Sequence, residues 1–433
     1  MSTVLFWFRH DLRLHDQPAL HAACADGTQH LVPVYCLPNV DETTPWGFAR
    51  MGPHRLAWLA TALRDLGDQL SGLACPLLVC PGPAASTLPL LAQTLGTTTV
   101  VCEEIAAPDE QAEVEALRAA GLQVRTVWQN SMLDPTQLPW DIQTLPAVFT
   151  TFRQALERAQ CQPSAPLPAP ATLPPWPSGL EPPAALDCAA PWLTRRAKAT
   201  GPRSSFPYDQ ARFHGGETAG LAHLAQYLAR KLPDSYKCTR DGLTGVDYSS
   251  KWSPWLATGA LSARRIVAEL RRYEAAHGAS DGSYWLWFEL LWRDYFRFLH
   301  LQQGRRLYRA QGLSDRPLSP HNAQGFERWR QARTGQPLVD AAMRELMATG
   351  FLSNRLRQVV ASYLVHDLGG DWRAGAAWFE SQLVDYDVYS NQGNWLYIAG
   401  RGTDPRGGRR FNVDKQAADH DPDGAYRRLW SAD

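Results

Sequence analysis

Short runs of apolar residues alternate with helix-like stretches through the first 128 positions of the chain. Each run spans five or six residues and is almost unbroken, which is typical of a strand covered on both faces of a parallel sheet. Strands that alternate with helices predict βαβ units, and therefore a Rossmann-like α/β domain over residues 1–128. The expected strands are residues 3–8, 30–35, 76–80, 98–102 and 123–127, and the expected helices are 17–24, 53–71, 84–95 and 108–120.

This expected domain lacks the glycine signatures that hold phosphates in related folds. Neither Gly-x-Gly-x-x-Gly nor a Walker sequence occurs in it. Those glycines let a backbone approach a pyrophosphate closely. The pattern therefore supports the fold and gives no support for a dinucleotide in the usual Rossmann position.

The periodicity is lost between residues 129 and 205. Residues 163–191 are dense in proline and alanine, a composition typical of an extended connection that lies over a surface. We predict a Pro-rich connecting segment over residues 129–205.

From residue 217 onward, helical spacing replaces the strand pattern. A good N-cap residue, Ser262, precedes one of the helical stretches, and another is strongly aromatic. We therefore expect an all-helical domain over residues 206–433. Its expected helices are residues 218–232, the stretch from Ser262 to about 275, 284–299 and 338–347.

Polar residues gather between residues 350 and 397, inside an otherwise apolar stretch. Asn354 and Arg357 lie three positions apart and share one face at the start of a helix. Asp385, Asp387 and Asn391 follow among tryptophans and phenylalanines. Carboxylates and amides are costly to bury there without partners. A helix cap or a salt bridge explains any one of them, but the whole group favours a ligand pocket.

A second polar group, Ser249, Ser250, Lys251 and Ser253, stands just before an expected short helix at 254–258. Hydroxyls and free N–H groups that converge before a helix can cradle an anion. A capped turn explains the same pattern equally well, and the sequence leaves both interpretations open.

Length and charge extend this picture. A chain of 433 residues is long for a single core and favours two or three domains. Residues 1–150 hold seven Arg, no Lys and fifteen acidic side chains, a net charge of −8, whereas residues 151–433 hold 36 basic and 28 acidic ones, a net of +8. The positive C-terminal part suggests a polyanionic partner, either a nucleic acid or a diphosphate cofactor.

Other features argue against whole classes of protein. No apolar run approaches the length of a membrane span and the N-terminus lacks a signal-peptide layout, so we expect a cytoplasmic protein with no membrane partner. Eight cysteines without a Cys-x-x-Cys pair argue against structural zinc, and we predict no metal site. Seventeen tryptophans, concentrated after residue 250, are mostly core residues, and a minority are candidates for redox or base-stacking roles.

Several longer motifs stand along the chain: Phe-Trp-Phe-Arg-His-Asp-Leu-Arg at 6–13, Tyr-Ser-Ser-Lys-Trp-Ser-Pro-Trp-Leu-Ala-Thr-Gly at 248–259, Glu-Leu-Leu-Trp-Arg-Asp-Tyr-Phe at 289–296, Arg-Thr-Gly-Gln-Pro-Leu-Val-Asp at 333–340, Gly-Phe-Leu-Ser-Asn-Arg at 350–355 and Asn-Gln-Gly-Asn-Trp at 391–395. Taken together, they resemble the photolyase/cryptochrome family over nearly the full chain. Tyr397 stands two residues after Trp395, where bacterial dimer photolyases usually carry another Trp. This residue and the segment Ala-Gly-Arg-Gly-Thr-Asp-Pro-Arg at 399–406 resemble the DASH branch.

The resemblance implies an FAD folded into a U shape inside the helical domain, which fits the missing glycine signatures. Arg357 would pair with Asp385 near the flavin ring, Asp387 would bond to the cofactor, and Asn391 would face flavin N5. Ser249, Ser250, Lys251 and Ser253 would hold the diphosphate. The other implied cofactor-binding residues are Tyr236, Trp252, Glu289, Arg293 and Asn354.

The implied reaction is light-driven electron transfer from reduced FAD to a cyclobutane pyrimidine dimer in DNA, preferably single-stranded. Glu289 and Asn354 would hydrogen-bond the dimer bases, while Trp292 and Tyr397 would offer flat faces to them. Backbone phosphates would meet Arg240, Arg355 and one of Arg409 or Arg410. We expect a monomer.

A tryptophan relay that reduces the flavin is also implied, and here the sequence departs from the family. Trp395 and Trp372 match its inner and middle members, but the outer position falls near Ser319. The electron that reduces the flavin would then pass by another route, through Trp329 or Tyr308, or the photoreduction would be slow.

Three alternatives stay open. A (6-4) photoproduct as substrate is disfavoured, because Ser353, Asn354 and Gln358 stand where active-site histidines would be needed. A 5,10-methenyltetrahydrofolate antenna, with Glu104 as its nearest candidate contact, would occupy a region that matches the folate site poorly. A blue-light photoreceptor that signals through a partner is the rival function; such proteins usually carry a long C-terminal tail, and the sequence stops three residues after Trp430.

Overall fold

The apolar runs of the first 128 residues form a five-stranded parallel sheet in the order β3-β2-β1-β4-β5, as the alternating pattern predicts. The computed structural model describes residues 2–25, 27–181 and 200–431. The strands are β1 (Thr3–Phe8), β2 (His30–Cys36), β3 (Leu78–Cys80), β4 (Thr99–Glu103) and β5 (Gln123–Val127), and the helices that connect them are α1 (Pro18–Ala23), α2 (Pro53–Gly72), α3 (Ala84–Leu95) and α4 (Pro108–Ala119).

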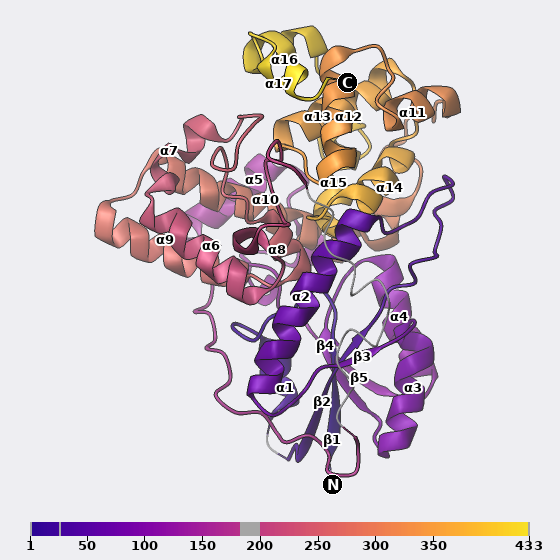
Figure 1. Ribbon diagram of the computed structural model, residues 1–433, viewed down its shortest axis with the longest axis vertical. Helices are drawn as coiled ribbons and strands as arrows, with labels where there is room; N and C mark the ends of the chain where they lie inside the picture. The colour runs from indigo at the N-terminus through magenta and orange to yellow at the C-terminus, as the bar shows by residue number, and fades with distance from the viewer. Residues whose placement is uncertain (1, 26, 182–199, 432–433) are drawn as a thin grey trace.

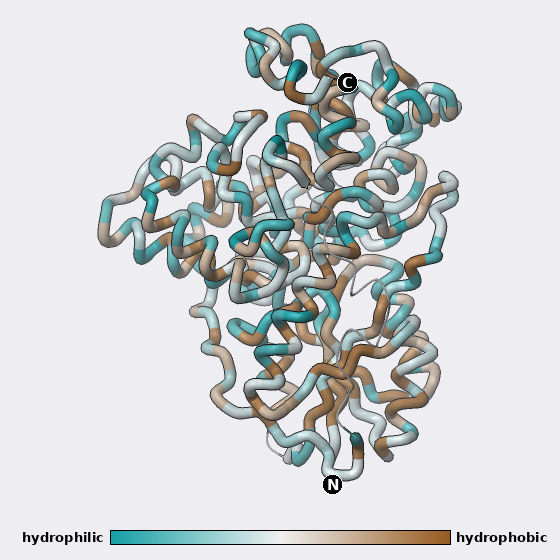
Figure 2. Tube along the Cα trace, viewed as in Figure 1, coloured by the Kyte–Doolittle hydropathy of each residue, from teal (hydrophilic) through white to brown (hydrophobic). Residues whose placement is uncertain are grey.

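Both faces of the sheet are covered, which is why its strands read as continuous apolar runs. Val4, Phe6 and Phe8 of β1 point to one face and pack with α1 and α2. Leu5 and Trp7 point to the other face and pack with α3 and α4. Figure 1 shows α1 and α2 on one side of the strands and α3 and α4 on the other, and Figure 2 shows the strands as a hydrophobic centre.

Most of the remaining helices lie beyond one end of the sheet (Figure 1), whereas residues 161–181 contain no helix and run beside the sheet, where the Pro175 carbonyl accepts a hydrogen bond from the Leu31 N–H of β2. The remaining α-helices are α5 (Phe149–Arg158), α6 (Glu217–Ala229), α7 (Leu232–Thr239), α8 (Ser253–Thr258), α9 (Ala263–His277), α10 (Asp281–Gln303), α11 (Ala323–Arg330), α12 (Pro337–Thr349), α13 (Asn354–Ser362), α14 (Trp372–Gln382), α15 (Val388–Ile398), α16 (Val413–His420) and α17 (Ala425–Leu429). Helix α13 continues as a π-helix over Tyr363–Asp367, and 3-10 turns occur at Pro135–Gln137, Ile142–Thr144, Ala211–Phe213 and Gly304–Tyr308. An α/β sheet joined to an all-helical part is the fold class that the sequence predicts.

Two local predictions need correction. The stretch 129–205 is not a simple connection, because α5 lies within it and buries Phe149, Phe152 and Leu156. Their spacing of three and four residues was a helical signal that the surrounding prolines obscured. The helix expected over 218–232 forms as α6 but ends at Ala229, because Lys231 adopts a left-handed φ of 56° before α7 begins.

Ser262 accepts a hydrogen bond from the Arg265 N–H and caps α9, as expected from the sequence. Residues 182–191 of the Pro-rich stretch lie outside the described residues. The domain limits at 128 and 205 stay a prediction. No helix among the described residues has the length and hydrophobicity needed to cross a membrane.

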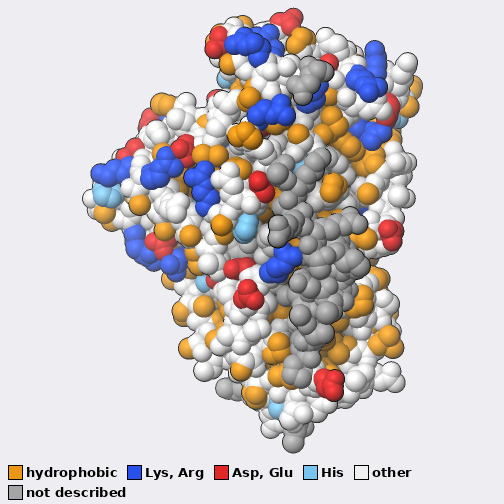
Figure 3. Space-filling model, viewed as in Figure 1, with side chains coloured by type: hydrophobic (Ala, Val, Ile, Leu, Met, Phe, Trp, Pro, Cys, Tyr) orange, Lys and Arg blue, Asp and Glu red, His pale blue; other side chains and the backbone are white. Residues whose placement is uncertain are grey.

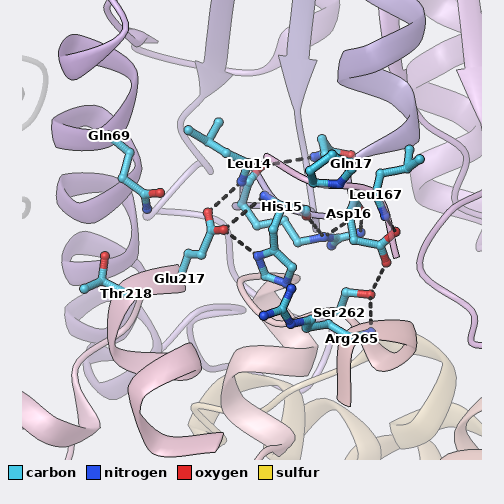
Figure 4. Close-up of polar contacts among 12 residues, drawn as sticks. Leu14, His15, Asp16, Gln17, Gln69, Leu167, Glu217, Thr218, Ser262 and Arg265 are labelled. Atoms are coloured by element: carbon cyan, nitrogen blue, oxygen red, sulfur yellow. Dashed lines mark hydrogen bonds and ion pairs between the residues drawn. The ribbon is translucent and has the colours of Figure 1, made fainter. Parts of the chain in front are cut away.

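The sheet and the helical part are joined by the loop that follows β1. The Glu217 carboxylate on α6 accepts hydrogen bonds from the backbone N–H groups of Leu14, at 2.6 Å, and His15, at 3.0 Å, and also contacts the His15 ring. Asp16 meets Ser262 and, at 2.9 Å, Arg264 of α9. Figure 4 shows Glu217 directed at Leu14 and His15, and Ser262 directed at Asp16.

One glycine makes this junction possible. Gly259 follows α8 at a φ of 70°, and a Cβ placed on it would lie 2.0 Å from the carbonyl oxygen of His10. Its own carbonyl accepts a hydrogen bond from Arg13 at 2.7 Å. Any side chain at this position would force the loop after β1 away from α8.

Candidate functional site

A cavity of about 580 Å³ opens within the helical part. Its walls come from α7, the loop before α8, and helices α10, α13 and α15. The volume lies in the range of small-molecule and cofactor sites. It brings together most of the residues predicted from the sequence: Tyr236, Arg240, Ser249, Ser250, Lys251, Trp252, Ser253, Glu289, Trp292, Arg293, Asn354, Arg355, Arg357, Asp385, Tyr397 and Arg409.

A smaller cavity of about 90 Å³ adjoins the first, because Asn354, Arg357 and Asp385 line both. It is lined in addition by Asp387, Asn391 and Trp395. The polar group between residues 350 and 397 is therefore gathered around connected cavities. Of the predicted site residues, Trp372 and Arg410 line neither cavity.

Lys251 is the most unusual side chain of the larger cavity. It is 2 % exposed, its backbone is left-handed with a φ of 58°, and its Nζ has no hydrogen-bond partner. The ammonium lies 3.1 Å from the centre of the Tyr248 ring and 5.0 Å from that of Phe351. Burial lowers the pKa of Lys251 well below its usual range. A buried amine on a cavity wall that has no hydrogen-bond partner is poised to receive an anion.

Beside it, Arg357 and Asp385 form the predicted pair, with Arg357 Nη2 donating to Asp385 Oδ2 at 2.8 Å. Ser253 Oγ donates to the same oxygen at 2.6 Å, and Arg357 Nε donates to the Leu352 carbonyl. Asp385 Oδ1 is buried and has no partner. The pair is thus held in place by α8 and α13, while one buried carboxylate oxygen of Asp385 has no partner within the protein.

Two predicted cofactor contacts are engaged by the protein itself. Asp387 caps α15 by accepting from the Ser390 N–H at 2.8 Å, and its other oxygen accepts from Arg297, also at 2.8 Å. Burial opposes the charge of Asp387, yet Arg297 and Arg293 hold its pKa below the usual range. Arg293 donates to the backbone carbonyls of Asn130 and Leu256, and burial lowers its pKa to about 10. Arg297 was not found from the sequence, since a cation inside an aromatic helix gives no distinguishing pattern.

Aromatic and charged side chains surround the wider part of the cavity. Trp292 stacks on Phe149 with ring centres 3.7 Å apart and meets the Tyr397 ring edge-on at 5.6 Å. Arg409 donates to the Tyr397 hydroxyl. These contacts fix the planes of both rings. Phe149 belongs to the helix that the sequence analysis missed.

The predicted DNA-facing cations are each paired with a carboxylate. Arg240 pairs with Glu289, and Arg355 Nη2 lies 2.9 Å from Asp241. Arg409 lines the cavity, whereas Arg410 is largely exposed and pairs with Asp367 at 2.8 Å. Between the two arginines left open by the sequence, the cavity geometry favours Arg409. In Figure 3 most Lys and Arg side chains lie over the helical part.

The tryptophans of the expected relay occupy different surroundings. Trp395 contacts Trp329 and Phe379, at ring-centre distances of 6.3 and 5.1 Å. Trp372 donates its Nε1–H to the Ala310 carbonyl at 3.0 Å and makes no ring contact within the described part of the chain. Trp329 therefore has the more direct contact with Trp395. Tyr308 hydrogen-bonds His300 at 3.1 Å.

The site suits a flavin dinucleotide rather than a metal. The unpartnered Lys251 amine and three serines offer donors for a diphosphate, and the Arg357–Asp385 pair offers a cation and an acceptor for the edge of a flavin ring. No group of His, Cys, Asp and Glu residues suited to a metal ion occurs among the described positions.

Comparisons with known proteins agree with this geometry. A family model described as "FAD binding domain of DNA photolyase" matches residues 285–432, and one described as "DNA photolyase" matches residues 4–171. The chain is 44 % identical to a protein named Cryptochrome DASH from Gloeobacter violaceus over 99 % of this chain and 85 % of that one. It is 42 % identical to the Cryptochrome DASH of Xenopus laevis, over 99 % and 82 %.

Solved structures show the same likeness. The cryptochrome of Synechocystis sp. PCC6803 superimposes with a TM-score of 0.90 at 42 % identity, covering 99 % of this chain and 88 % of that one. A bacterial class III photolyase from Agrobacterium tumefaciens superimposes with a TM-score of 0.81 at 29 % identity, covering 99 % and 86 %. This chain therefore belongs to the photolyase/cryptochrome family, within its DASH branch. FAD is its cofactor, and its function is of the DNA-photolyase or cryptochrome type.

Proposed function

We propose that this protein repairs cyclobutane pyrimidine dimers, preferably in single-stranded DNA, with light as the energy source. The observation that carries the proposal is that one cavity is lined by donors suited to a flavin cofactor, by the rings of Trp292 and Tyr397, and by the cations Arg240, Arg355 and Arg409. FAD in its reduced form, when bound, supplies the photoexcited electron donor. The side chains described below would hold the cofactor and the lesion.

On the cofactor side, Lys251 and the serines before α8 would bind the diphosphate, and Arg357 with Asp385 would orient the flavin ring. Asn391 lies in the adjoining cavity, where its Nδ2 donates to the Ala376 carbonyl at 3.0 Å. That hydrogen bond orients the amide, so its oxygen is available to a donor on the flavin edge.

On the DNA side, Trp292 and Tyr397 would stack on the two unstacked bases of the dimer. Base–aromatic stacking contributes about 1–3 kcal/mol per base. Glu289 and Asn354 would hydrogen-bond the base edges, and Arg240, Arg355 and Arg409 would meet the phosphates. A single strand presents its lesion without the cost of unpairing, so it should be the preferred substrate.

The test is illumination of the flavin-loaded, reduced protein with a dimer-containing oligonucleotide, followed by chromatographic recovery of intact thymines. We expect recovery in the light, none in the dark, and faster recovery from single strands than from duplex. Arg409→Gln should weaken binding of the oligonucleotide, whereas the matched variant Arg410→Gln, outside the cavity, should leave it unchanged. Equal affinity for single strands and duplex would contradict the proposed preference.

The competing function is a blue-light photoreceptor, and the word cryptochrome in the relatives' names is compatible with it. A protein that binds FAD and is reduced by light, yet recovers no thymine from either strand form, would support that function instead. We also propose a 5,10-methenyltetrahydrofolate antenna near Glu104 and a monomeric protein. The absorbance spectrum of the purified protein tests the antenna, and its sedimentation tests the monomer.

The relay can be tested in the same sample. We propose that Trp395 passes electrons inward and that Trp329, which contacts it, is the next member alongside Trp372. Trp329→Phe should slow photoreduction by an external thiol more than Trp372→Phe does. The reverse order would favour the relay inferred from the family.

A further inference from the structure

Two ion pairs link the segment that follows α7 to helices that line the larger cavity. Arg240 pairs with Glu289 of α10, and the next residue, Asp241, pairs with Arg355 of α13 at 2.9 Å. Arg240, Glu289 and Arg355 line the cavity, whereas Asp241 does not. The carboxylate of Asp241 therefore neutralises a cavity arginine from outside the cavity.

The Asp241 carboxylate is held less firmly than that of Asp385, which also pairs with a cavity arginine. The Asp241 side chain is 42 % exposed, and Arg355 is its one side-chain partner within the described part of the chain. The Asp385 side chain is 2 % exposed and accepts hydrogen bonds from both Arg357 and Ser253. Asp241 can therefore exchange its arginine for water at little cost, whereas Asp385 cannot.

Arg355 is the other member of this exchangeable pair. Among the described residues its guanidinium makes one hydrogen bond, from Nη2 to Asp241 Oδ1, and its Nε is buried without a partner. A guanidinium presents its N–H donors as a planar fork, which fits a phosphate as well as a carboxylate. Because both groups are anions that need the same donors, Asp241 and a strand phosphate would compete for Arg355.

We propose that Asp241 is a specificity-determining residue that competes with DNA phosphate for Arg355. The inference rests on the proposed function, in which Arg355 meets the strand. In the free protein Asp241 neutralises Arg355, and a strand has to displace this carboxylate before its phosphate reaches the guanidinium. An undamaged strand has no dimer to place against Trp292 and Tyr397, so it has the fewest contacts to offset that cost and is the most readily released.

The first test is the affinity of the FAD-loaded full chain for an undamaged oligothymidylate, measured by fluorescence anisotropy in the dark at equal FAD content. Asp241→Asn keeps the size of the side chain and removes its charge. We expect about two- to fivefold tighter binding, in keeping with the modest strength of a partly exposed ion pair. The matched control is Asp281→Asn, which removes the same charge from a pair with Lys237 outside both cavities and should bind as the wild type does. Equal or weaker binding by Asp241→Asn would overturn the proposal, since a carboxylate that only orients Arg355 for the strand predicts a loss.

The second test asks whether the gain acts through Arg355. Arg355→Gln alone should weaken binding of the same oligonucleotide, and in that background Asp241→Asn should bring no further gain. A gain that persists in the double variant would mean that Asp241 acts by its charge at a distance, and the proposal would be wrong.

The single variants separate this proposal from the proposed function. A loss in Arg355→Gln without a gain in Asp241→Asn overturns the competition and leaves the proposed DNA contact in place. If Arg355→Gln binds as the wild type does, both the contact and the competition are wrong. Binding of an undamaged strand in the dark involves no repair, so none of these outcomes depends on whether the protein repairs dimers.

Discussion

Two regions of this protein are candidate nucleotide sites: the carboxyl ends of the strands and the cavity of the helical part. Both contain buried charged and polar side chains, but the two regions differ in how these side chains are paired. At the carboxyl ends of the strands, Asp11 accepts hydrogen bonds from the Arg9 N–H at 2.7 Å and from Gln129 at 2.8 Å. Arg13 donates to Asn130 at 2.7 Å. In the helical cavity, by contrast, Lys251 Nζ and Asp385 Oδ1 have no partner. Most polar groups pair with each other in the first region, although Gln17 Oε1 and Glu103 Oε2 have no partner, whereas Lys251 and Asp385 of the second region line a cavity.

The difference teaches why a Rossmann-like sheet is not the cofactor site here. The strand ends, where such sheets usually bind ligands, are covered by the helical part, since Arg13 also bonds Gly259 and Arg293 bonds Asn130. The polar groups at this edge connect two parts of the protein. In the helical part, buried polar groups without a protein partner lie around a cavity, where hydrogen bonds to a ligand can offset the free-energy cost of burying them.

The largest effect is expected from a substitution in the helical cavity, which tests whether this cavity, rather than the sheet edge, binds the cofactor. Asp385→Ala should lower FAD affinity about 100-fold, because truncating one member of a buried pair leaves Arg357 without its counter-charge. The measurement is a flavin titration of the variant. Asp247→Ala, which removes an exposed partner of Arg230, is the matched control and should bind like the wild type. Normal FAD binding by Asp385→Ala would place the flavin elsewhere.

The next effect concerns the junction between the regions. Glu217→Gln should lower the free energy of unfolding by about 2 kcal/mol, because the amide cannot satisfy both the Leu14 and His15 N–H groups as the carboxylate does. Urea denaturation measures this. The exposed Glu115→Gln, which loses only an ion pair with Arg118, should change stability by less than about 0.5 kcal/mol. Equal effects would mean that Glu217 does not hold the two parts together.

A smaller effect is expected for the proposed DNA side. Trp292→Ala should weaken binding of a dimer-containing single strand about tenfold, in line with the loss of one stacking partner. Tyr284→Ala is the control on the same helix, because Tyr284 is exposed and bonds Glu157 outside the cavity. A gel-shift series measures both. If the two variants lose affinity alike, DNA binding does not involve the cavity.

The last prediction concerns the carboxyl edge of the sheet and the way in which the free energy of unfolding depends on pH. Burial raises the pKa of Glu103 to about 8, from an ordinary value of 4.5. Between these values the folded protein holds a proton that the unfolded chain releases, so this group lowers stability as pH rises from about 5 to about 8. Glu103→Gln should remove that slope, so that the variant gains stability relative to the wild type as pH rises from about 5 to about 8. Its half-buried neighbour Glu104→Gln should keep the wild-type slope, and an unchanged slope in both would show that Glu103 is ionised in the fold.

Local pattern was enough to predict much of this molecule. The strands of the sheet are recognisable because covered parallel strands are continuously apolar, and α9 begins at Ser262 because a serine there can cap it. Asn354, Arg357 and Asp385 were recognisable as a group because polar residues in an apolar stretch need partners. The helix α5 was missed because its apolar spacing lies between prolines.

What the sequence by itself determined was the kind of element at each position and which polar residues require a hydrogen-bond or charged partner when buried. Only the tertiary structure decided which of these residues find that partner within the protein. Asp387 and Asp385 look alike in sequence, yet Arg297 neutralises the first and an open oxygen remains on the second. Tyr426 donates its hydroxyl proton to Glu345, 81 positions earlier in the chain, and no local pattern encodes such a contact, since hydrogen bonds of this kind form only when separate helices pack together.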